Sequence, residues 1–550
     1  IYTDYMLNYN KTFGDWDVSA TLGWVGHTIK GESHSYDSGN ATYYFANRQK
    51  LSTLVNYFST SAGGPRTLSQ SMTSDWNKGA VLTAQVGWKD KIYVDGSYRE
   101  DWYRSFRQFK DRGTPEHYGY FGFGANAIVS SLVKLPEWFN YLKYRASYSE
   151  VGNSIPNQVY GVQTINYETG AYTASEWATF KDPRPEKTAS FETGIESLFL
   201  NNRLSLDLTY YNATMSNLYL VGSNASGKKI PMNSCKIRNQ GVEATVGYDF
   251  KFGAQGLRWK TSYNVSYNSN QILRTAYDEK TGKENVIASY VGGVQVLYKE
   301  GGKFGDMYVT DLKRYTEASA AKYNKRNASK IEAGELTAVK EGWYVLNSKG
   351  GVQMDSENTY GKFIGNMNSD WQMGWTNNFS YKDFTLSFLI NGRIGGKVLS
   401  MTEAFLDGYG LSQRSADARL SAEANKVFAD KVYGDNVLGI KLDDGSGRTV
   451  PVEGYYQSVG GVTPQDIERY LYSGTNFRLR ELSFGYTFRD LFGANKNLNL
   501  SFIARNLFFL YKDAPVDPDV SLSTGTGLSA FEVFNMPSSR SFGFSLNVNF

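Results

Sequence analysis

The residues able to carry acid–base, nucleophilic or metal chemistry are few in this chain of 550 residues. The three histidines are His27, His34 and His117, and none has a Ser, Cys or acidic partner at a spacing typical of a catalytic triad or a zinc site. The one cysteine, Cys235, is interpreted as a small apolar residue rather than a nucleophile. We therefore predict no catalytic residues, no bound metal and no cofactor.

Two glycine-containing segments have some features of ligand-binding loops. LDDGSGR (442–448) has two carboxylates but lacks the repeated acidic positions and the final Glu of an EF-hand, so it is interpreted as an acidic turn. TGTG (524–527) lacks the Lys and the following helix of a phosphate-binding loop. Lys plus Arg exceeds Asp plus Glu by 58 − 54 = 4, an excess too small to indicate a nucleic-acid partner.

Aromatic side chains beside amides and charges offer the chemistry of binding instead. Rings stack on the apolar faces of sugars and peptides, while amides and charges bind hydroxyl or backbone groups. Such residues gather in the segments 30–76 and 153–186, which are expected to be long loops. The alternative for each residue is a structural role, as an anchor of a loop or of a membrane interface. The candidate substrate-binding residues are Tyr36, Tyr43, Tyr44, Tyr167, Tyr172 and Trp177.

The elements that must position these loops are strands in which apolar and polar side chains alternate. Residues 541–550 show this alternation, as do 16–24, 204–210 and 242–250. No run approaches the roughly 18 apolar residues of a membrane-spanning helix. Because aromatic residues recur at strand ends and the polar faces carry Asp and Glu, the pattern favours a transmembrane antiparallel β-barrel over a soluble all-β sandwich.

About fifteen strands are predicted, and the connections between them alternate between short and long. In outer-membrane barrels the short turns are periplasmic and the long loops extracellular, which places residue 1 on the extracellular side. Because the count is odd and the chain begins at Ile1 rather than Met, we expect it to be the C-terminal part of a larger barrel. The predicted strands begin near residues 2, 15, 77, 91, 116, 139, 187, 203, 237, 257, 368, 383, 476, 497 and 540.

Two local features interrupt the regular pattern. In 476–488, Arg478 and Arg480 share the parity of the apolar residues that follow, so a β-bulge near Glu481 or a position above the bilayer is predicted. Residues 423–434 are interpreted as a short helix that caps the loop 396–475.

Motifs in the same order along residues 140–550 resemble those of the SusC/RagA family of TonB-dependent transporters. The segments that carry this resemblance are RPEKTASFETGIESLFLNNRLSLDLTYY (184–211), IRNQGVE (237–243), EGGKFGDMYV (300–309), NFRLRELSFGYTF (476–488), ARNLFFL (504–510), VDPDV (516–520) and MPSSRSFGFSLNVNF (536–550). The last four are similar to the family's terminal three strands.

The resemblance implies that residues 1–550 supply about 15 C-terminal strands of a 22-stranded plugged barrel in the bacterial outer membrane. An N-terminal remainder would then provide the plug, the TonB box and about 22 − 15 = 7 strands. The implied partners are that remainder, TonB, a SusD-like surface lipoprotein that lids the barrel, outer-membrane lipid, and the barrel-assembly machinery. The aromatic C-terminal residue Phe550 resembles the signal that this machinery reads.

The function implied by the resemblance is TonB-energised import of oligosaccharides or oligopeptides. The alternatives are an outer-membrane barrel enzyme, such as a protease or lipase, and a passive porin. An enzyme needs a cluster of Ser, His or carboxylate residues at the barrel rim, and the sequence displays no such set. Loops approaching about a hundred residues suit a lidded transporter better than a porin. The sequence leaves the choice between glycan and peptide open.

Overall fold

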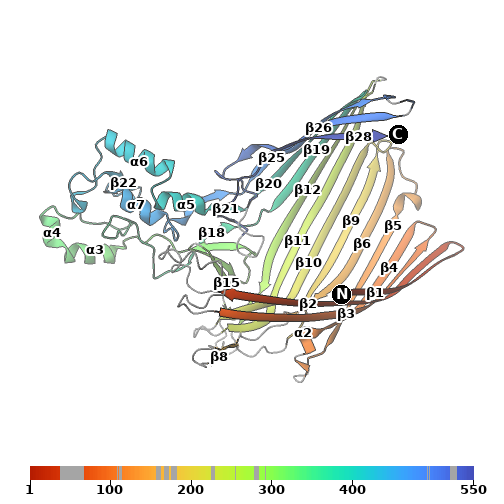
Figure 1. Cartoon of the computed structure of the whole chain (residues 1–550), viewed down its shortest axis with the longest axis horizontal. Coiled ribbons are helices and arrows are strands. Elements are labelled where there is room, and N and C mark those ends of the chain that lie inside the picture. The colour runs from red at the N-terminus through yellow and green to blue at the C-terminus, as the bar shows by residue number, and fades with distance from the viewer. Residues whose placement is uncertain are drawn as a thin grey trace, which may run out of the picture. The chain divides into compact units, whose positions relative to one another are not determined.

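Long β-strands dominate the computed structural model of the chain (Figure 1). The residues that it describes are 1–37, 67–107, 109–110, 114–155, 163–165, 172–174, 183–223, 229–253, 256–277, 284–285, 287–291, 293–491, 493–494, 496–520 and 529–549. No helix among these residues has the length and apolar character needed to cross a membrane.

Fifteen strands form one sheet in the order of the chain, and β1 and β28 stand at the two ends of that order. The strands are β1 (Tyr2–Phe13), β2 (Trp16–Asp37), β3 (Thr67–Trp88), β4 (Ile92–Tyr103), β5 (His117–Ile128), β6 (Phe139–Asn153), β9 (Glu186–Phe199), β10 (Leu204–Ser223), β11 (Lys229–Phe252), β12 (Leu257–Arg274), β19 (Trp371–Tyr381), β20 (Phe384–Ile394), β25 (Asn476–Phe488), β26 (Asn497–Lys512) and β28 (Ser541–Asn549). The predicted number of strands and their order are confirmed. β3 begins earlier than predicted, because its pairing with β2 continues out to Asp37 and Thr67. β11 also begins earlier, at Lys229.

Residue contacts divide the chain into two compact units. The first comprises residues 1–125, 147–189 and 228–233, and the second comprises 126–146, 190–227 and 234–550. β1 to β4 belong to the first unit, and β12, β19, β20, β25, β26 and β28 to the second.

In the first unit, the register of β2, β3 and β4 places apolar side chains on one face and polar side chains on the other. Residues directly opposite one another in an antiparallel pair share a face. Leu22, Leu82 and Tyr98 are aligned across the three strands in this way, and so, on the other face, are Asp17, Gly87 and Tyr93. We call the face that holds Leu22, Leu82 and Tyr98 the apolar face.

Tight turns join the paired strands at the predicted short connections. Gly14 has φ +61° between β1 and β2, and Lys89 and Asp90 have φ 52° and 54° between β3 and β4. Two-residue turns with positive φ match the right-handed twist of the strands that they join. The short connections at 14–15 and 89–91 are therefore true hairpin turns, as predicted.

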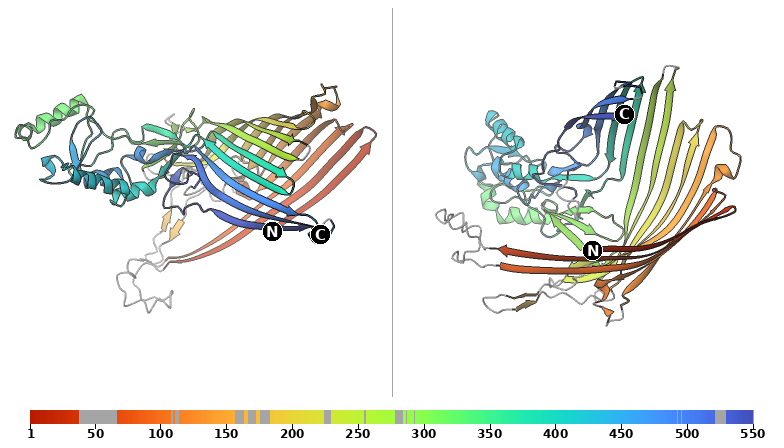
Figure 2. Two further views of the ribbon diagram at one scale, coloured as in Figure 1. Left: turned by 90° about the horizontal axis from the view of Figure 1, so that it is seen from above. Right: turned by 45° about the vertical axis from the view of Figure 1, so that its right-hand side comes forward.

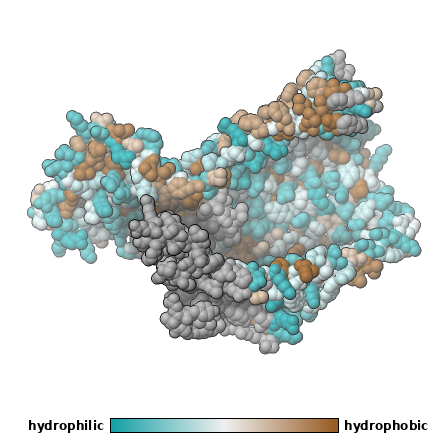
Figure 3. All heavy atoms as spheres, viewed as in Figure 1, coloured by the Kyte–Doolittle hydropathy of each residue, from teal (hydrophilic) through white to brown (hydrophobic). Residues whose placement is uncertain are grey.

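In the second unit, β12, β19 and β20 lie side by side, as Figure 2 shows from two further directions. Apolar side chains gather where β25, β26 and β28 lie, at the upper right of Figure 3. Phe502 is aligned with Phe544 and Leu500 with Leu546, and all four side chains are exposed. The apolar residues of the predicted alternating segment 541–550 are thus aligned with apolar residues of β26, on the same exposed face.

The β-bulge predicted in β25 is confirmed at Arg480. Glu481 pairs with Leu389 and Leu479 with Ile390, so Arg480 has no partner on β20, and the register with β26 shifts at the same point. The extra residue reverses the parity of the strand. It thereby separates Arg478, which is buried, from the apolar residues after the bulge.

The long connections of the second unit fold into small sheets and short helices. One sheet contains β15 (Ile287–Val291), β16 (Val294–Tyr298), β17 (Asp306–Val309) and β18 (Lys362–Asn366), and another contains β21 (Lys397–Ser400), β24 (Leu471–Ser473) and β27 (Phe531–Glu532). The helices are α3 (Glu317–Arg326), α4 (Ala328–Glu332), α5 (Met401–Gly408), α6 (Gln413–Ala424) and α7 (Val452–Val459). The remaining short elements are α2 (Arg104–Arg107), β7 (Gln163–Ile165), β8 (Tyr172–Ala174), β13 (Ala276–Tyr277), β14 (Glu284–Asn285), β22 (Gly439–Lys441) and β23 (Thr449–Pro451).

These connections have apolar cores of their own. In one, Met307 of β17, Leu399 of β21 and Phe531 of β27 are fully buried together. In the other, Val450 and Val459 are buried beside α7. Residues drawn from three separate connections therefore pack into one region.

The helix predicted over 423–434 is wrong. α6 precedes most of that segment and ends at Ala424, after which Asn425 bonds back to the Ser421 carbonyl at 2.9 Å. Lys426 then has φ 51°, a conformation that stops a right-handed helix, and only one 3₁₀ turn follows at Lys431–Tyr433.

Candidate binding site

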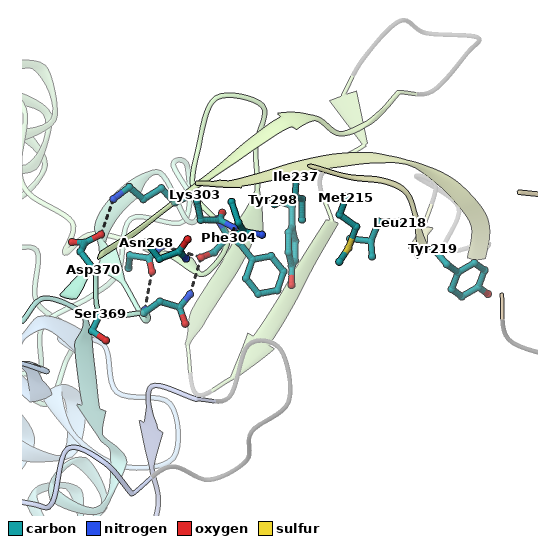
Figure 4. Close-up of a pocket in the computed structure, with 14 residues that line it drawn as sticks. Met215, Leu218, Tyr219, Ile237, Asn268, Tyr298, Lys303, Phe304, Ser369 and Asp370 are labelled. Carbon is teal, nitrogen blue, oxygen red and sulfur yellow. Dashed lines mark hydrogen bonds and ion pairs between the residues drawn. The ribbon is translucent and has the colours of Figure 1, made fainter. Parts of the chain in front are cut away.

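A cavity of about 560 Å³ lies in the second unit, where the ends of β11 and β12 meet the folded connections (Figure 4). Its lining comprises Met215, Leu218, Tyr219, Ile237, Asn239, Asn268, Asn270, Tyr298, Lys303, Phe304, Asn366, Asn368, Ser369 and Asp370. Asn268 and Asn270 continue a polar row along one face of β12 that includes Ser262, Asn264 and Ser266. The cavity therefore opens on the polar face of β12.

A glycine-rich turn joins the cavity to β12. Gly301 has φ +82°, which an L side chain rarely adopts, and its N–H donates to the carbonyl of Ile272 at 2.8 Å. The Ile272 N–H in turn donates to the carbonyl of Gly302 at 2.8 Å. Because Ile272 is fully buried, this pair of bonds fixes where Lys303 and Phe304 enter the cavity.

Five asparagines form the polar wall, and we call Asn239, Asn268, Asn270, Asn366 and Asn368 the asparagine cluster. Asn270 Oδ1 accepts from the Phe304 N–H at 2.7 Å, and its Nδ2 donates to Asn239 Oδ1 at 2.7 Å. The Nδ2 groups of Asn366 and Asn368 donate to the Phe304 carbonyl at 3.1 and 2.9 Å. Both backbone polar groups of Phe304 are thus held by amide side chains.

An ion pair closes one end of the wall. Lys303 Nζ lies 3.1 Å from Asp370 Oδ1, and both side chains are nearly half exposed. The backbone supports the pair, because the Asn268 N–H donates to the Asp370 carbonyl at 3.0 Å. Partial exposure leaves both charges accessible to a polar ligand in the cavity.

The opposite wall is apolar and aromatic. The rings of Tyr298 and Phe304 meet edge to face, with centroids 5.2 Å apart. Met215 and Leu218 come from β10, which is irregular here because Asn217 has φ 57°. That conformation lets residues on both sides of Asn217 contribute to the same wall. A ring or an aliphatic group can therefore bury surface here while amides bind its polar neighbours.

A second cavity of about 300 Å³ shares Asn268, Asn368, Ser369 and Asp370 with the first. It is more polar, and its lining includes Arg393 and Lys397. The segment 368–370 is thus a common wall between an aromatic cavity and a cationic one. Together they offer adjacent positions for consecutive units of a chain-like ligand.

The metal-binding and nucleophilic candidates from the sequence have the following surroundings among the described residues. They contain no group of three or more His, Cys, Asp and Glu side chains placed to hold a metal ion. His117 contacts Glu100, and Cys235 is fully buried. In 442–448, Asp444 accepts from the Tyr344 and Ser446 N–H groups at 2.8 and 3.0 Å and pairs with Arg448, so this segment is a structural turn.

The structure describes the strand positions of two of the candidate binding residues from the sequence. Tyr36 lies in β2 opposite Leu68, and Tyr172 pairs with Ile165 in the hairpin of β7 and β8. Both remain predictions. The candidates outside the described residues are Tyr43, Tyr44, Tyr167, Trp177 and the proposed assembly signal Phe550. The TGTG segment, 524–527, also lies outside them.

The sequence did contain a signal for the asparagine cluster. An Asn-x-Asn pattern occurs at 268–270 and 366–368, each time at the end of a predicted or observed strand. The signal is weak, because the same pattern also occurs at 8–10, 495–497, 497–499 and 547–549. In a strand, residues two apart point to the same side, so each pattern places two amides on one face. Nothing in the sequence indicated that the two patterns meet around Phe304.

Comparison with known proteins gives a consistent result. The family described as "TonB dependent receptor-like, beta-barrel" matches residues 2–391. Two curated relatives from Formosa agariphila, TonB-dependent receptor P3 and TonB-dependent receptor P39, are 21% and 23% identical over 99% of the chain. The chain spans 52% of the length of each, about half.

Solved structures agree on the fold. A structure of the RagAB peptide transporter aligns with 99% of the chain and 54% of its own chain, with a TM-score of 0.69 and 16% identity. The RagAB peptide importer in its "open-open" state aligns with 100% of the chain and 54% of its own, with a TM-score of 0.70 and 17% identity. At this identity the likeness establishes the β-barrel fold.

Proposed function

The chain belongs to the TonB dependent receptor-like β-barrel family, and we propose that it is part of an outer-membrane transporter that imports large nutrients with energy delivered through TonB. Strands with one apolar and one polar face suit a barrel that crosses the membrane many times. Since the chain spans about half of each curated relative, we propose that the rest of the protein supplies the plug, the TonB-binding segment and about seven strands.

The observation that carries the proposal is the cavity on the polar face of β12. It combines an aromatic wall, an asparagine cluster and an accessible ion pair. Amide side chains both donate and accept hydrogen bonds, so they suit a peptide backbone or sugar hydroxyls. We propose that the cavity binds one unit of an oligopeptide or oligosaccharide during import.

A surface lipoprotein of the SusD type is the proposed partner of the long connections. The similar structures are those of the RagAB peptide transporter. The folded connections of this chain support the proposal, because the described residues of 284–366 and 397–473 form sheets and helices with buried apolar cores rather than short turns. Such a folded region offers a stable surface for a lid.

Uptake by cells that express the full-length transporter and its lipoprotein tests the proposal. The substrates are a fluorescent oligopeptide pool and a fluorescent oligosaccharide pool, and uptake is compared with and without TonB. Asp370→Asn removes the charge that pairs with Lys303 and should lower TonB-dependent uptake about tenfold, in the range of a lost charged hydrogen bond. Asn268→Ala should act in the same direction.

Glu357→Gln is the matched control, because Glu357 forms an exposed ion pair with Lys313 at 3.1 Å outside the cavity lining. It should leave uptake unchanged. Surface labelling must give equal amounts of all variants. Uptake that is independent of TonB would contradict active import, and unchanged uptake in both cavity variants would contradict the assigned binding site.

A further inference from the structure

A group of cationic side chains lies on the apolar face of β2, β3 and β4, at the end of the strands that leads into the long connections. Lys30 is aligned with Ser74, and Lys78 is aligned with Gly26 and Trp102. Residues opposite each other or two apart share a face, so Lys30, Ser74 and Lys78 all lie on it. The side chains of Lys30 and Lys78 are exposed.

Arg104 completes the group from the residue that follows β4. Its Nη1 donates to Ser74 Oγ at 2.6 Å. Since Lys30 is directly opposite Ser74 on β2, the two cations flank one hydroxyl. Lys78 lies four residues further along β3, with its ammonium group 5.2 Å from the Trp76 ring. We call Lys30, Lys78 and Arg104 the cationic rim.

Tryptophans lie between the cationic rim and the apolar side chains. The rings of Trp24 and Trp102 are 5.4 Å apart, and both residues lie on the apolar face beside the rim. At the other end of the same strands, the rings of Trp16 and Trp88 are 6.5 Å apart. Trp24 and Trp16 are eight residues apart on β2, or about 26 Å at roughly 3.3 Å per residue.

Strands of outer-membrane barrels tilt by about 35–45°, so about 26 Å along β2 spans about 20 Å of membrane depth, within an apolar band that is about 25 Å tall and bounded by aromatic residues at both interfaces. Lys78 is aligned with Gly26, ten residues from Trp16 along β2, which corresponds to about 33 Å of strand and about 25 Å of depth. The cationic rim therefore lies at the depth of lipid headgroups, just outside the band. Long basic side chains placed there extend their charges to the interface while their stems cover apolar surface. Lys30 and Lys78 form no ion pair within the described part of the chain. Their charges are therefore not used to hold the strands together.

Acidic groups lie on the same face as the cationic rim. Glu100 is next to the rim, but its carboxylate contacts His117 and accepts from the Tyr98 hydroxyl. Glu32 lies one position beyond Lys30 on the same face. Among the described residues, this end of the face thus has three cationic side chains, one histidine and two carboxylates. The histidine contacts one of those carboxylates.

We propose that the cationic rim binds the phosphate group of a phosphorylated lipid in the membrane leaflet that surrounds this end of the strands. The phosphate would accept hydrogen bonds from Lys78 and Arg104, with Lys30 adding charge, while the acyl chains lie against the apolar face below. The inference rests on the proposed membrane location, but it concerns the lipid-facing side of the strands rather than the import cavity.

The test uses the purified full-length transporter in nanodiscs of phosphatidylcholine that contain diphosphoryl lipid A or its dephosphorylated form. Native mass spectrometry measures the retained lipid. The wild type should retain the phosphorylated form selectively. Lys78→Gln and Arg104→Gln should each weaken retention about fivefold, and the double variant about 30-fold, the factors that correspond to about 1 kcal/mol per cation near an anionic lipid surface.

Lys89→Gln is the matched control, because Lys89 also lies 5.2 Å from a tryptophan ring, that of Trp88, but at the opposite end of β3. It should not change retention. Equal retention of both lipids by the wild type, or retention by the double variant equal to the wild type, would overturn the proposal. Displacement of the lipid by millimolar inorganic phosphate would also overturn it, because it would indicate a site for free anions.

Uptake is measured separately on the same variants, so that the two proposals can fail independently. Loss of lipid selectivity with normal TonB-dependent uptake would leave the transport function intact. Loss of uptake with normal lipid selectivity would leave the cationic rim intact.

Discussion

Arg478 of β25 and Asp517, in the connection between β26 and β28, form an ion pair in which the side chains are only 5% and 8% exposed. The guanidinium group also lies 4.1 Å from the centre of the Phe509 ring, and Asp519 Oδ2 is 3.6 Å away. The arginine that was out of place in the strand pattern therefore ties the last long connection to the sheet.

Breaking this pair should destabilise the protein strongly. Asp517→Asn leaves a buried guanidinium with only the more distant Asp519, and loss of one partner of a buried pair typically costs about 3–5 kcal/mol. The variant should unfold at a clearly lower temperature, read as the temperature at which the folded band disappears on a semi-native gel. The double variant Arg478→Gln/Asp517→Asn should be less affected, since no unpaired charge remains.

Arg505 and Glu481 provide the control for this measurement. They pair at 2.9 Å between β26 and β25, but their side chains are 61% and 39% exposed. Exposed pairs contribute about 0–1 kcal/mol, so Glu481→Gln should hardly move the unfolding temperature. Equal shifts in Glu481→Gln and Asp517→Asn would show that burial of the Arg478 pair is not what matters.

The asparagine cluster depends on the absence of a side chain at Gly305. A Cβ added there would lie 2.7 Å from Asn368 Nδ2 and 2.7 Å from Met367 Cγ, and φ is +93°. Gly305→Ala should therefore displace Asn368 and lower ligand uptake several-fold. The measurement is TonB-dependent uptake by cells with equal surface amounts of transporter.

Gly301→Ala separates crowding from backbone strain. Gly301 has a similar φ of +82°, but an added Cβ would meet nothing within 4 Å. Both variants carry the cost of a strained alanine, about 1–2 kcal/mol, and only Gly305→Ala disturbs the cluster. If the two variants lose uptake equally, the strain of the glycine-rich turn explains the effect.

The strands were predictable because their information is local. Each has a period of two over about ten residues, and a hairpin turn fixes the register of its neighbour. Even the bulge at Arg480 followed from parity, because an arginine on the apolar face is costly. The sequence predicted the bulge that accommodates Arg478, but it did not indicate its acidic partner, Asp517, which lies 39 residues away.

The folded connections and the cavity were not predictable for the opposite reason. Met307, Leu399 and Phe531 pack in one core although the first and last are more than two hundred residues apart, and no periodic pattern links them. The cavity likewise depends on where the connection that holds Lys303 returns to β12. The wrong helix at 423–434 has a local cause. Lys426 takes the left-handed conformation that ends a helix, with the Val427 N–H bonded to the Ala422 carbonyl at 2.8 Å, but it is not the glycine that usually marks this position in a sequence.

The turn at Asp444 should make its surroundings sensitive to acid. Burial alone raises the pKa of Asp444, but hydrogen bonds from Ser446, the Tyr344 N–H and Arg448 outweigh it and hold the pKa below the ordinary 3.8. A group whose folded-state pKa is lowered stabilises the fold above its unfolded-state pKa, and this contribution is lost as the pH falls through the folded-state value. Protection of the Tyr344 amide should therefore decline below about pH 4.

Hydrogen–deuterium exchange of peptides covering 340–348, corrected for the intrinsic rate at each pH, measures that decline. In Asp444→Asn the protection should already be low at pH 6 and should change little with acid. Asp355→Asn is the control, because Asp355 accepts only a local bond from the Glu357 N–H at 3.2 Å. A wild type whose protection is the same at pH 3 and pH 6 would argue against the role of Asp444.

The orientation of the strands can be checked at two glycines in connections of opposite type. Gly334 follows α4 in a long connection, and Gly493 lies between β25 and β26 in a short one. Neither would bring an added Cβ closer than 3.9 Å to another residue, so a short epitope tag is tolerable at both. On intact cells the tag at Gly334 should be labelled by antibody, whereas the tag at Gly493 should be labelled only after the outer membrane is permeabilised. The reverse pattern would mean that the long connections face the periplasm, and the lidded-import proposal would fail with it.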